Sequence, residues 1–345
     1  MHIVIVTDAW KPQVNGVVRT LQSLSENLEA QGDTVCLITP DQFKTVPCPT
    51  YPEIRLALMA GKRVGDIIES QRPCAVHIST EGPLGLAARR YCLRHKIPFT
   101  TAFHTRFPEY VNARFRTPVS LGYSLMRWFH GPSRGVMVAT PTLFNELKDR
   151  GIGNVTRWTR GVDTALFRPV ARDYLDALGL ERPYFMYVGR VATEKNIDAF
   201  LRLDLPGTKF VVGDGPSLPG LAKKYPKVHF TGPKFGEELA SHYAAADVFV
   251  FPSLTDTFGL VMLEALACGT PVAAFPVTGP IDVIADSGVG VLDQDLQKAA
   301  LAALKIDREA CRAYATQYSW PACAAQFRGS LARFDPLEIS AWSLD

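Results

Sequence analysis

Short apolar runs alternate with helix-favouring segments along both halves of this chain, and the connections between them are short. In the first half these runs predict strands at residues 2–7, 34–39, 75–79, 99–103, 136–140 and 154–159. The second half predicts strands at 184–189, from 211, from 228, at 248–251 and at 289–292. Such alternation is typical of parallel sheets covered by helices. We therefore predict an α/β protein with doubly wound parallel sheets.

The length and the cysteine content narrow the class of protein. A chain of 345 residues is long enough for two domains, each with its own core. The seven cysteines form no Cys-x-x-Cys pair and lie in apolar runs, which indicates buried thiols in a reducing compartment. The first apolar run has no basic region before it and ends at Asp8, so we expect a strand and not a signal peptide. No apolar stretch approaches the roughly 20 residues that span a bilayer. We expect a cytoplasmic protein whose membrane contact is peripheral.

The positive charge is concentrated in the first half. Residues 1–170 carry 21 lysines and arginines against 13 acidic residues, whereas residues 171–345 carry 16 against 21. Within the basic half, residues 104–134 mix arginines with aromatic residues. This segment is either a core helix with a solvated basic face or a segment that lies on an anionic membrane surface. Nucleic acid is a weaker alternative because no nucleic-acid-binding motif accompanies the charge, and we expect no such partner.

Residues 252–272 form a predicted strand–loop–helix unit in the second half. The apolar run 248–251 ends in a polar loop, and a helix-favouring segment begins near Phe258 and stops at Gly269. Asp256 lies just before this helix, and its first turn offers the backbone amides of Gly259, Leu260 and Val261 to an anionic group such as a phosphate. Glu264 follows among apolar neighbours, and a carboxylate in such a setting needs a partner.

Other polar residues follow predicted strands, at the edge where ligands bind to parallel sheets. Asn15-Gly16 is either a tight turn or part of a ligand-binding loop. Glu81 either caps a helix or has a functional role, as a contact to the acceptor substrate or as a general base. His104 ends a strand, although a lone histidine is more often structural. Arg190 and Lys195, on one loop, are placed to clamp a diphosphate, with surface solvation as the alternative.

The segment Pro-Ser-x-x-Asp-x-Phe-Gly-x-x-x-Leu-Glu-Ala-x-Ala-x-Gly-x-Pro-Val (252–272) resembles the signature of the retaining, nucleotide-sugar-dependent glycosyltransferases of GT-B fold, the sucrose-synthase and mannosyltransferase-like family. The resemblance implies two Rossmann-like domains facing a cleft. It also implies that Asp256, which is usually Glu in that family, holds the donor sugar. The helix from Phe258 would hold the diphosphate and Glu264 the nucleotide ribose.

Further motifs occur in the order of the same family. Gly16 and Val17 open the first predicted helix. In the family, a Gly-Val pair at this place faces the donor diphosphate and the acceptor, which implies the same role for Gly16 and Val17. His104 lies in Phe-His-Thr-x-Phe-Pro-x-Tyr, similar to the family's active-site histidine. The segment 189–196 resembles the family motif whose Arg and Lys neutralise the leaving nucleotide, which implies that role for Arg190 and Lys195. The loops with Gly213 and Gly232 would flank the nucleobase.

The resemblance implies an acceptor domain over residues 1–168, a donor domain over 169–318 and a last helix, 319–345, that crosses back to the first domain. It implies metal-independent transfer with retention, without a cofactor. Asp293-Gln-Asp295 looks like the metal-binding Asp-x-Asp of another glycosyltransferase class, but it precedes a helix, so we predict capping.

The segments 51–54, 80–87, 103–110 and 255–259 look most like those of bacterial enzymes that glycosylate diacylglycerol. This resemblance implies a UDP-sugar donor and a lipid acceptor at an anionic membrane. It also implies acceptor contacts at Glu81, Arg106 and Tyr110. Two alternatives stay open: a GDP-mannose-dependent mannosyltransferase acting on phosphatidylinositol or a polysaccharide, and a non-catalytic relative that binds nucleotide sugars. A dinucleotide-dependent oxidoreductase is disfavoured because no Gly-x-Gly-x-x-Gly opens the first helix.

Overall fold

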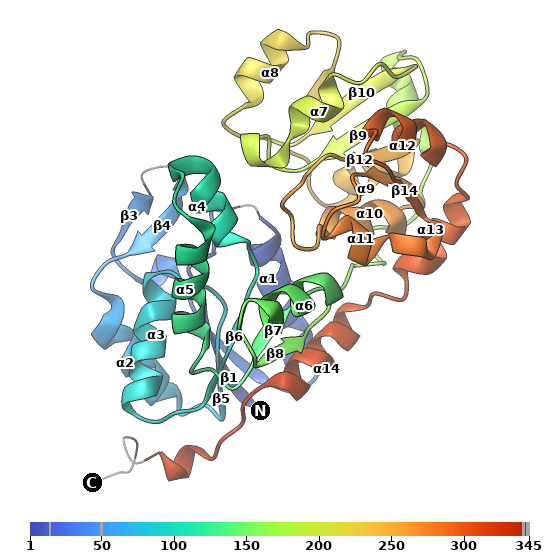
Figure 1. Cartoon of the computed structure of the whole chain (residues 1–345). Coiled ribbons are helices and arrows are strands. Elements are labelled where there is room, and N and C mark those ends of the chain that lie inside the picture. The colour runs from blue at the N-terminus through green and yellow to red at the C-terminus, as the bar shows by residue number, and fades with distance from the viewer. Residues whose placement is uncertain (14, 49–50, 340–341, 343–345) are drawn as a thin grey trace. The chain divides into compact units, whose positions relative to one another are not determined.

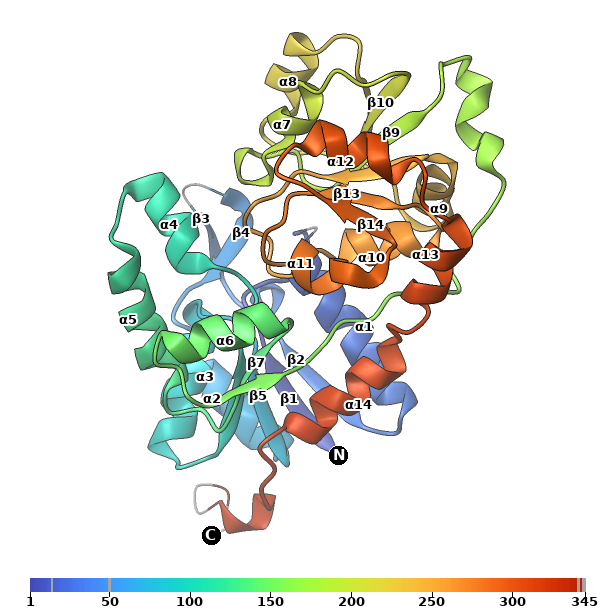
Figure 2. The same cartoon turned by 45° about the vertical axis from the view of Figure 1, so that its right-hand side comes forward.

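The computed structural model describes residues 1–13, 15–48, 51–339 and 342. It divides into two compact units (Figures 1 and 2). Unit 1 comprises residues 1–159 and 321–345, and unit 2 comprises residues 160–320. Each unit contains a six-stranded parallel sheet covered by helices, which confirms the predicted α/β class.

The sheet of unit 1 has the strand order β2-β1-β5-β6-β7-β8, and all of its neighbouring strands are parallel. Its strands begin within one residue of the predicted positions: β1 His2–Val6, β2 Thr34–Ile38, β5 Ala75–Ile78, β6 Phe99–Ala102, β7 Val136–Val138 and β8 Val155–Arg157. The strand order reverses direction between β1 and β5. A separate antiparallel hairpin of β3 (Thr45–Cys48) and β4 (Tyr51–Ala57) was not predicted.

Helices cover both faces of the unit 1 sheet, which is why its strands are nearly continuous apolar runs. Val4 and Val6 of β1 pack with one set of helices, and Ile3 and Ile5, which point the other way, are equally buried. The helices of this unit are α1 Gly16–Ala30, α2 Ala60–Gln71, α3 Pro83–Arg94, α4 Phe107–Phe115, α5 Val119–His130 and α6 Pro141–Asp149, with short turns η1 Pro40–Gln42 and η5 Pro336–Glu338.

The last helix, α14 (Trp320–Ser330), packs on unit 1 after the chain leaves unit 2. The Trp158 indole donates to the Cys323 sulfur at 3.2 Å, and the Arg328 guanidinium pairs with Asp33 at 2.9 Å. The Thr159 amide donates to the Gln326 side chain at 2.7 Å. The C-terminal segment of the chain is therefore part of the first unit's structure.

Unit 2 repeats the architecture with the strand order β11-β10-β9-β12-β13-β14, again parallel throughout. Its strands are β9 Tyr184–Val188, β10 Thr208–Val212, β11 His229–Gly232, β12 Val248–Phe251, β13 Val272–Ala274 and β14 Gly290–Leu292. The α-helices are α7 Ile197–Leu201, α8 Leu218–Lys224, α9 Gly236–Ala245, α10 Leu260–Ala267, α11 Pro280–Val283, α12 Leu296–Ala303 and α13 Arg308–Ala315. Short turns occur at η2 Arg172–Leu178, η3 Thr193–Lys195 and η4 Ala285–Ser287.

The cores of the two units contain most of the cysteines. Cys92, Cys268, Cys311 and Cys323 are buried, and burial raises the pKa of the Cys92, Cys268 and Cys311 thiols to about 12. These thiols are therefore protonated and inert at neutral pH, and their burial agrees with the buried thiols that the sequence predicts.

In the part of the chain that the structure describes, no helix combines the length and apolar character that crossing a bilayer requires.

A glycine is required where α3 begins. A Cβ atom on Gly85 would lie 1.9 Å from the Thr80 carbonyl oxygen, inside any permitted contact distance. By contrast, a Cβ on Gly61, in the first turn of α2, would meet no atom within 4 Å.

We predict that Gly85→Ala destabilises the protein by about 1–3 kcal/mol, because α3 must move away from the loop after β5. The matched variant Gly61→Ala is expected to be neutral or to stabilise by about 0.4–1 kcal/mol, because alanine restricts the unfolded chain. Urea unfolding midpoints of the two variants check this. Equal midpoints would contradict the close approach at Gly85.

Candidate functional site

The first candidate site lies at the carboxyl edge of the unit 2 sheet, where the strand order reverses between β9 and β12. Ligands of doubly wound sheets bind at such switch points. The loop after β9 carries Arg190 and Lys195, and the loop after β12 carries Asp256. The structure thus places three of the predicted site residues on neighbouring loops of one unit.

The two loops are fastened to each other. The Lys195 ammonium contacts an Asp256 carboxylate oxygen at 2.5 Å, and both side chains are partly exposed. The Asn196 amide donates to the Pro252 carbonyl at 3.0 Å, and the Thr255 hydroxyl donates to the Glu194 carbonyl at 3.4 Å. The Lys195–Asp256 pair therefore lies within a framework of backbone-directed hydrogen bonds.

Tyr187 fixes the start of the Arg190 loop. Its hydroxyl donates to the Arg190 carbonyl at 2.8 Å, and its ring is buried. A Cβ on Gly189, which has φ of +146°, would lie 3.0 Å from this hydroxyl. Burial is the main reason that the Tyr187 pKa is raised, so the hydroxyl stays protonated and keeps donating. Tyr187 was not among the residues predicted for the site, because nothing in a strand residue signals a contact to the following loop.

The glycines predicted to flank the nucleobase allow these loops to come close together. A Cβ on Gly213 would lie 1.9 Å from the Gly189 carbonyl oxygen, and the Gly213 amide donates to the Gly232 carbonyl at 3.0 Å. The loops after β9, β10 and β11 are therefore in backbone contact. This packing gives Gly213 a structural role, whether or not it also contacts a ligand.

Helix α10 begins two residues later than predicted, at Leu260, after Gly259 in a left-handed conformation with φ of +86°. A Cβ on Gly259 would lie 2.8 Å from the end of the Met262 side chain and 3.0 Å from the Phe251 ring. The amides of Gly259, Leu260 and Val261 therefore lie at a helix N-terminus, where an anion is favoured. Phe258 is buried beneath this turn.

Glu264 is a buried carboxylate, 5% exposed, on the second turn of α10. It accepts a hydrogen bond at 3.0 Å from the hydroxyl of Tyr243, a fully buried residue of α9. The Tyr243 ring makes edge contacts with Phe167 and Phe249 that hold it in place. The expected partner of Glu264 is thus a tyrosine 21 residues earlier in the chain.

The second candidate site lies at the carboxyl edge of the unit 1 sheet, beside the reversal between β1 and β5. Asp8, two residues after β1, accepts hydrogen bonds from the amides of Leu84 at 2.8 Å and Gly85 at 3.2 Å, and from the Thr80 hydroxyl at 2.9 Å. Burial outweighs these bonds and raises the Asp8 pKa. Asp8 therefore caps α3 from a distant strand, a role that local sequence did not indicate.

Glu81 follows β5 and contacts a buried histidine. Its Oε1 lies 3.2 Å from Nε2 of His130, whose other ring nitrogen lies 2.9 Å from the Thr101 hydroxyl. The Thr101 hydroxyl in turn donates to the Ser133 hydroxyl at 3.3 Å. His130 is fully buried, whereas the Glu81 side chain is 24% exposed. The orientation of Glu81 is therefore fixed from inside the unit, and it is not simply a helix cap.

His104 follows β6 at the same edge and is partly buried. Its ring meets the Trp158 ring edge-on with centroids 5.8 Å apart. At the start of α1, the Asn15 side chain accepts from the amides of Val17 and Val18 at 3.0 Å each. Asn15-Gly16 is thus a helix cap, which leaves Gly16 exposed at this edge.

The two remaining acceptor candidates lie on or beside α4. Both guanidinium nitrogens of Arg106 contact the Glu146 carboxylate of α6, at 3.3 and 2.5 Å. Tyr110 belongs to α4, but its side chain lies outside the part of the chain that is described. The structure thus ties Arg106 to a carboxylate of its own unit.

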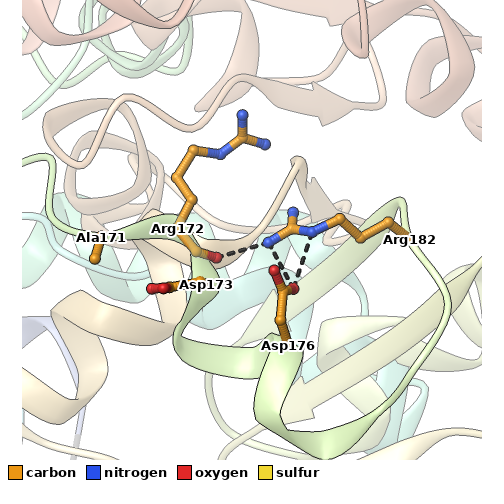
Figure 3. Close-up of a pocket in the computed structure, with 5 residues that line it drawn as sticks. All are labelled: Ala171, Arg172, Asp173, Asp176 and Arg182. Carbon is orange, nitrogen blue, oxygen red and sulfur yellow. Dashed lines mark hydrogen bonds and ion pairs between the residues drawn. The ribbon is translucent and has the colours of Figure 1, made fainter.

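A surface pocket of about 450 Å³ lies at the opposite edge of the unit 2 sheet and is formed by five residues of the segment 171–182 (Figure 3). Arg182 crosses it, donating to the Arg172 carbonyl at 2.6 Å and pairing with Asp176 at 2.9 Å (Figure 3). Arg182 also pairs with Asp247, the residue before β12, at 3.0 Å. This network fastens η2 to the amino ends of the strands, and none of the predicted site residues lies there.

Among the residues that the structure describes, no group of three histidine, cysteine or acidic side chains is arranged to hold a metal ion. Asp295 accepts from the amides of Gln297 and Lys298 at the start of α12, which confirms its predicted capping role. Asp293 pairs with Lys298 at 2.7 Å, and this bond lowers the Asp293 pKa.

Two family models match the chain, one for each half. "Glycosyltransferase Family 4" matches residues 14–166, and "Glycosyl transferases group 1" matches residues 182–306. Together they include both candidate sites apart from Asp8.

Curated relatives cover most of the chain. It is 30% identical to a sulfoquinovosyl transferase of Arabidopsis thaliana over 80% of this chain, but spans only 60% of that relative's length. It is 29% identical to a GDP-mannose-dependent alpha-mannosyltransferase of Mycobacterium tuberculosis, covering 85% of this chain and 83% of the relative. It is also 29% identical to an alpha-monoglucosyldiacylglycerol synthase of Streptococcus pneumoniae, covering 88% of this chain and 78% of the relative.

Solved structures share the fold. A sucrose-phosphate synthase of Thermosynechococcus elongatus matches with a TM-score of 0.76 and 23% identity, over 95% of this chain and 97% of that one. HepE of Anabaena, solved in complex with UDP-glucose, matches with a TM-score of 0.71 and 15% identity, over 96% of this chain and 99% of that one.

We predict that Tyr243→Phe lowers the free energy of unfolding by about 1–3 kcal/mol, because it removes a hydrogen bond from a carboxylate that stays buried. Urea unfolding measures the loss. The matched control is Tyr225→Phe, which removes a tyrosine hydrogen bond to the more exposed Asp198 and is expected to cost less. Equal losses would contradict the larger contribution to the free energy of unfolding that we expect from the Tyr243 hydrogen bond.

Proposed function

Because this chain belongs to the glycosyltransferases of GT-B fold, we propose that it transfers a hexose or hexuronic acid from a UDP-sugar to a membrane lipid such as diacylglycerol. The observation that carries the donor half of this proposal is the switch-point site of unit 2. There Lys195, Asp256, Arg190 and the start of α10 lie on adjoining loops that backbone contacts hold in place. Opposite charges and helix amides at one edge suit a substrate with both a diphosphate and a sugar.

Each donor group has a matching residue in unit 2. Arg190, Lys195 and the amides of α10 neutralise the diphosphate, and Asp256 accepts hydrogen bonds from sugar hydroxyls. The Lys195 ammonium has three donors, so it can keep its contact with Asp256 and bind a phosphate oxygen as well. Glu264, oriented by Tyr243, accepts hydrogen bonds from the ribose hydroxyls.

The proposed reaction proceeds on one face of the sugar. The bond from the anomeric carbon to the phosphate oxygen breaks, and the acceptor hydroxyl attacks from the same side. The leaving phosphate takes the hydroxyl proton, so that configuration is retained. Cationic side chains and helix amides stabilise the charge that develops on the leaving group. They supply the role that a metal ion has in other phosphate chemistry, and we propose that this reaction needs no metal or other cofactor.

Unit 1 supplies the acceptor contacts in this proposal. Glu81 contacts the acceptor and helps to orient it, while the proton of the attacking hydroxyl passes to the leaving phosphate, and His104 contacts the sugar near the reacting carbon. The relative from Streptococcus pneumoniae, an alpha-monoglucosyldiacylglycerol synthase that aligns with 88% of this chain, supports a diacylglycerol acceptor. The protein would then work in the cytoplasm, at the inner face of the cell membrane.

A second candidate is a mannosyltransferase that uses GDP-mannose, with phosphatidylinositol or a polysaccharide as acceptor. The relative from Mycobacterium tuberculosis favours it, because that protein is aligned over 83% of its own length. The two candidates differ in nucleobase and sugar, so donors separate them directly.

The test is a panel of UDP-, GDP- and ADP-sugars, read by thermal shift and by donor hydrolysis, with and without liposomes that contain diacylglycerol. We expect one UDP-sugar to stabilise the wild type and to be turned over faster with liposomes, and Glu264→Ala to lose the stabilisation. Glu237→Ala, an exposed glutamate on α9, is the matched control. Response to GDP-mannose alone would favour the second candidate, and stabilisation without turnover would favour a non-catalytic relative that binds nucleotide sugars. No response to any donor would mean that the family resemblance marks a fold and not an activity.

We also predict that Lys195→Ala lowers kcat by about 100- to 1,000-fold, the usual loss when one group that stabilises transition-state charge is removed. Lys223→Ala, on the exposed face of α8, is expected to leave kcat unchanged. NMR of the product gives the anomeric configuration, and turnover in EDTA tests independence from metal. Inversion at the anomeric carbon would contradict the same-face reaction.

A further inference from the structure

Helix α5 exposes an apolar stripe that no described residue of unit 1 covers. Leu121, Leu125 and Trp128 are spaced by four and three residues, so they lie on one face of the helix. They are 62%, 50% and 53% exposed. The opposite face of α5 is buried through residues such as Tyr123 and Phe129. The helix is thus apolar on both sides, although only one side has a partner in the described structure.

Helix α3 extends this surface. Its buried Arg89 stacks on the Trp128 ring, 4.1 Å from the centroid, and donates to the carbonyls of Phe129 at 2.9 Å and Trp128 at 2.6 Å. The two helices are therefore side by side, as both views show (Figures 1 and 2). Leu86 and Leu93 lie three residues before and four after Arg89, and both are exposed. We call these side chains and their basic neighbours the α3–α5 face: Leu86, Arg90, Leu93, Arg94, Leu121, Leu125 and Trp128.

The charge on the α3–α5 face has one sign. Arg90 and Arg94 are exposed, and neither α3 nor α5 contains an aspartate or a glutamate. Arg127 of α5 instead donates to the Arg150 carbonyl at 3.1 Å, away from this face. Single exposed leucines are ordinary on a protein surface. Five large apolar side chains on adjoining helices, with arginines and no acid among them, indicate an interaction surface. The Arg89 stack also fixes the Trp128 ring at this surface.

We propose that the α3–α5 face docks unit 1 on the surface of an anionic bilayer. Leu121, Leu125 and Trp128 enter the boundary between headgroups and acyl chains, and Arg90 and Arg94 contact the lipid phosphates. The choice of a bilayer follows from the combination of apolar side chains, one fixed tryptophan and uncompensated positive charge. The proposal deepens the proposed function and rests on it in one respect, because a lipid acceptor requires the enzyme to reach a membrane.

This surface differs from the one that the sequence indicated. In the segment 104–134, Tyr123 and Phe129 point into the core and Arg106 is paired with Glu146. Among the described residues of that segment, Leu121, Leu125 and Trp128 on the outer face of α5 are exposed, as is Phe107 of α4. Helix α3, which lies outside the segment, supplies the rest of the α3–α5 face.

The test is co-sedimentation of the full chain with sucrose-loaded vesicles of phosphatidylcholine alone or mixed with phosphatidylglycerol. We expect binding only to the anionic vesicles, and weaker binding at high salt. Leu121→Ser/Leu125→Ser is expected to lower partitioning by about tenfold or more, and Arg90→Gln/Arg94→Gln by about fivefold for each arginine. The matched control, Leu301→Ser/Leu304→Ser, changes two exposed leucines at and after the end of α12 in unit 2 and is expected to have no effect.

Brominated lipids provide a second readout, because they quench only tryptophans that reach the acyl chains. We expect quenching in the wild type that Trp128→Phe abolishes. The proposal is overturned if wild type binds neutral and anionic vesicles equally, or if the leucine and arginine variants bind as the wild type does. It is also overturned if no vesicle is bound and the face instead forms a dimer, detected by sedimentation velocity, that Leu121→Ser/Leu125→Ser abolishes.

Vesicle binding needs no donor, so failure of this proposal and failure of the proposed function are distinguishable. Binding to anionic vesicles without turnover of any donor would contradict only the proposed reaction. Transfer to a short-chain diacylglycerol dispersed in detergent, without vesicle binding, would contradict only the proposed docking surface.

Discussion

Parallel strand pairing is the constraint on which the rest of this structure depends. In each unit the six strands of the large sheet all run the same way, so every loop that follows one of them leaves at one edge of the sheet. Neighbouring loops there approach until their backbones touch. A Cβ on Gly215 would lie 2.4 Å from the Val191 carbonyl oxygen, and a Cβ on Gly279 would lie 2.7 Å from that of Asp256. The polar side chains of the site are thus placed by main-chain contacts, which hold position better than long side chains do.

The buried and half-buried carboxylates of the two units are stabilised in three different ways. Asp256 pairs with Lys195 at a partly exposed edge, where water can replace either partner when a substrate arrives. Glu264 lies in the core and receives a tyrosine hydroxyl, which adds a hydrogen bond without adding a second charge. Asp8 receives two amides at the start of α3. Of these three carboxylates, Asp256 is the most exposed, so its oxygens are the most accessible to the hydroxyls of an arriving donor sugar.

The parallel sheets could be predicted closely because strands buried on both faces are continuous apolar runs, and β12 was predicted residue for residue at Val248–Phe251. The hairpin β3–β4 was missed because its strands contain prolines and are not part of either large sheet. In the site, sequence pattern identified Lys195 and Asp256, which the fold brings into contact. It did not identify Tyr187, Tyr243 or Asp8, because their partners lie in other elements and no local spacing records such contacts.

Helix α5 connects the candidate acceptor residue Glu81 with the exposed apolar side chains of the α3–α5 face. On its inner side, His130 contacts Glu81, the candidate acceptor carboxylate at the end of β5, at 3.2 Å. On its outer side, Leu121, Leu125 and Trp128 are exposed. The Arg89 stack and its hydrogen bonds to the end of α5 fix this helix to α3, whose first turn is held by Asp8. A surface bound to the outer side of α5 would therefore lie at a set distance from Glu81, through rigid helix and not through a loop. A lipid whose hydroxyl must reach Glu81 while its chains stay in the bilayer requires that kind of connection.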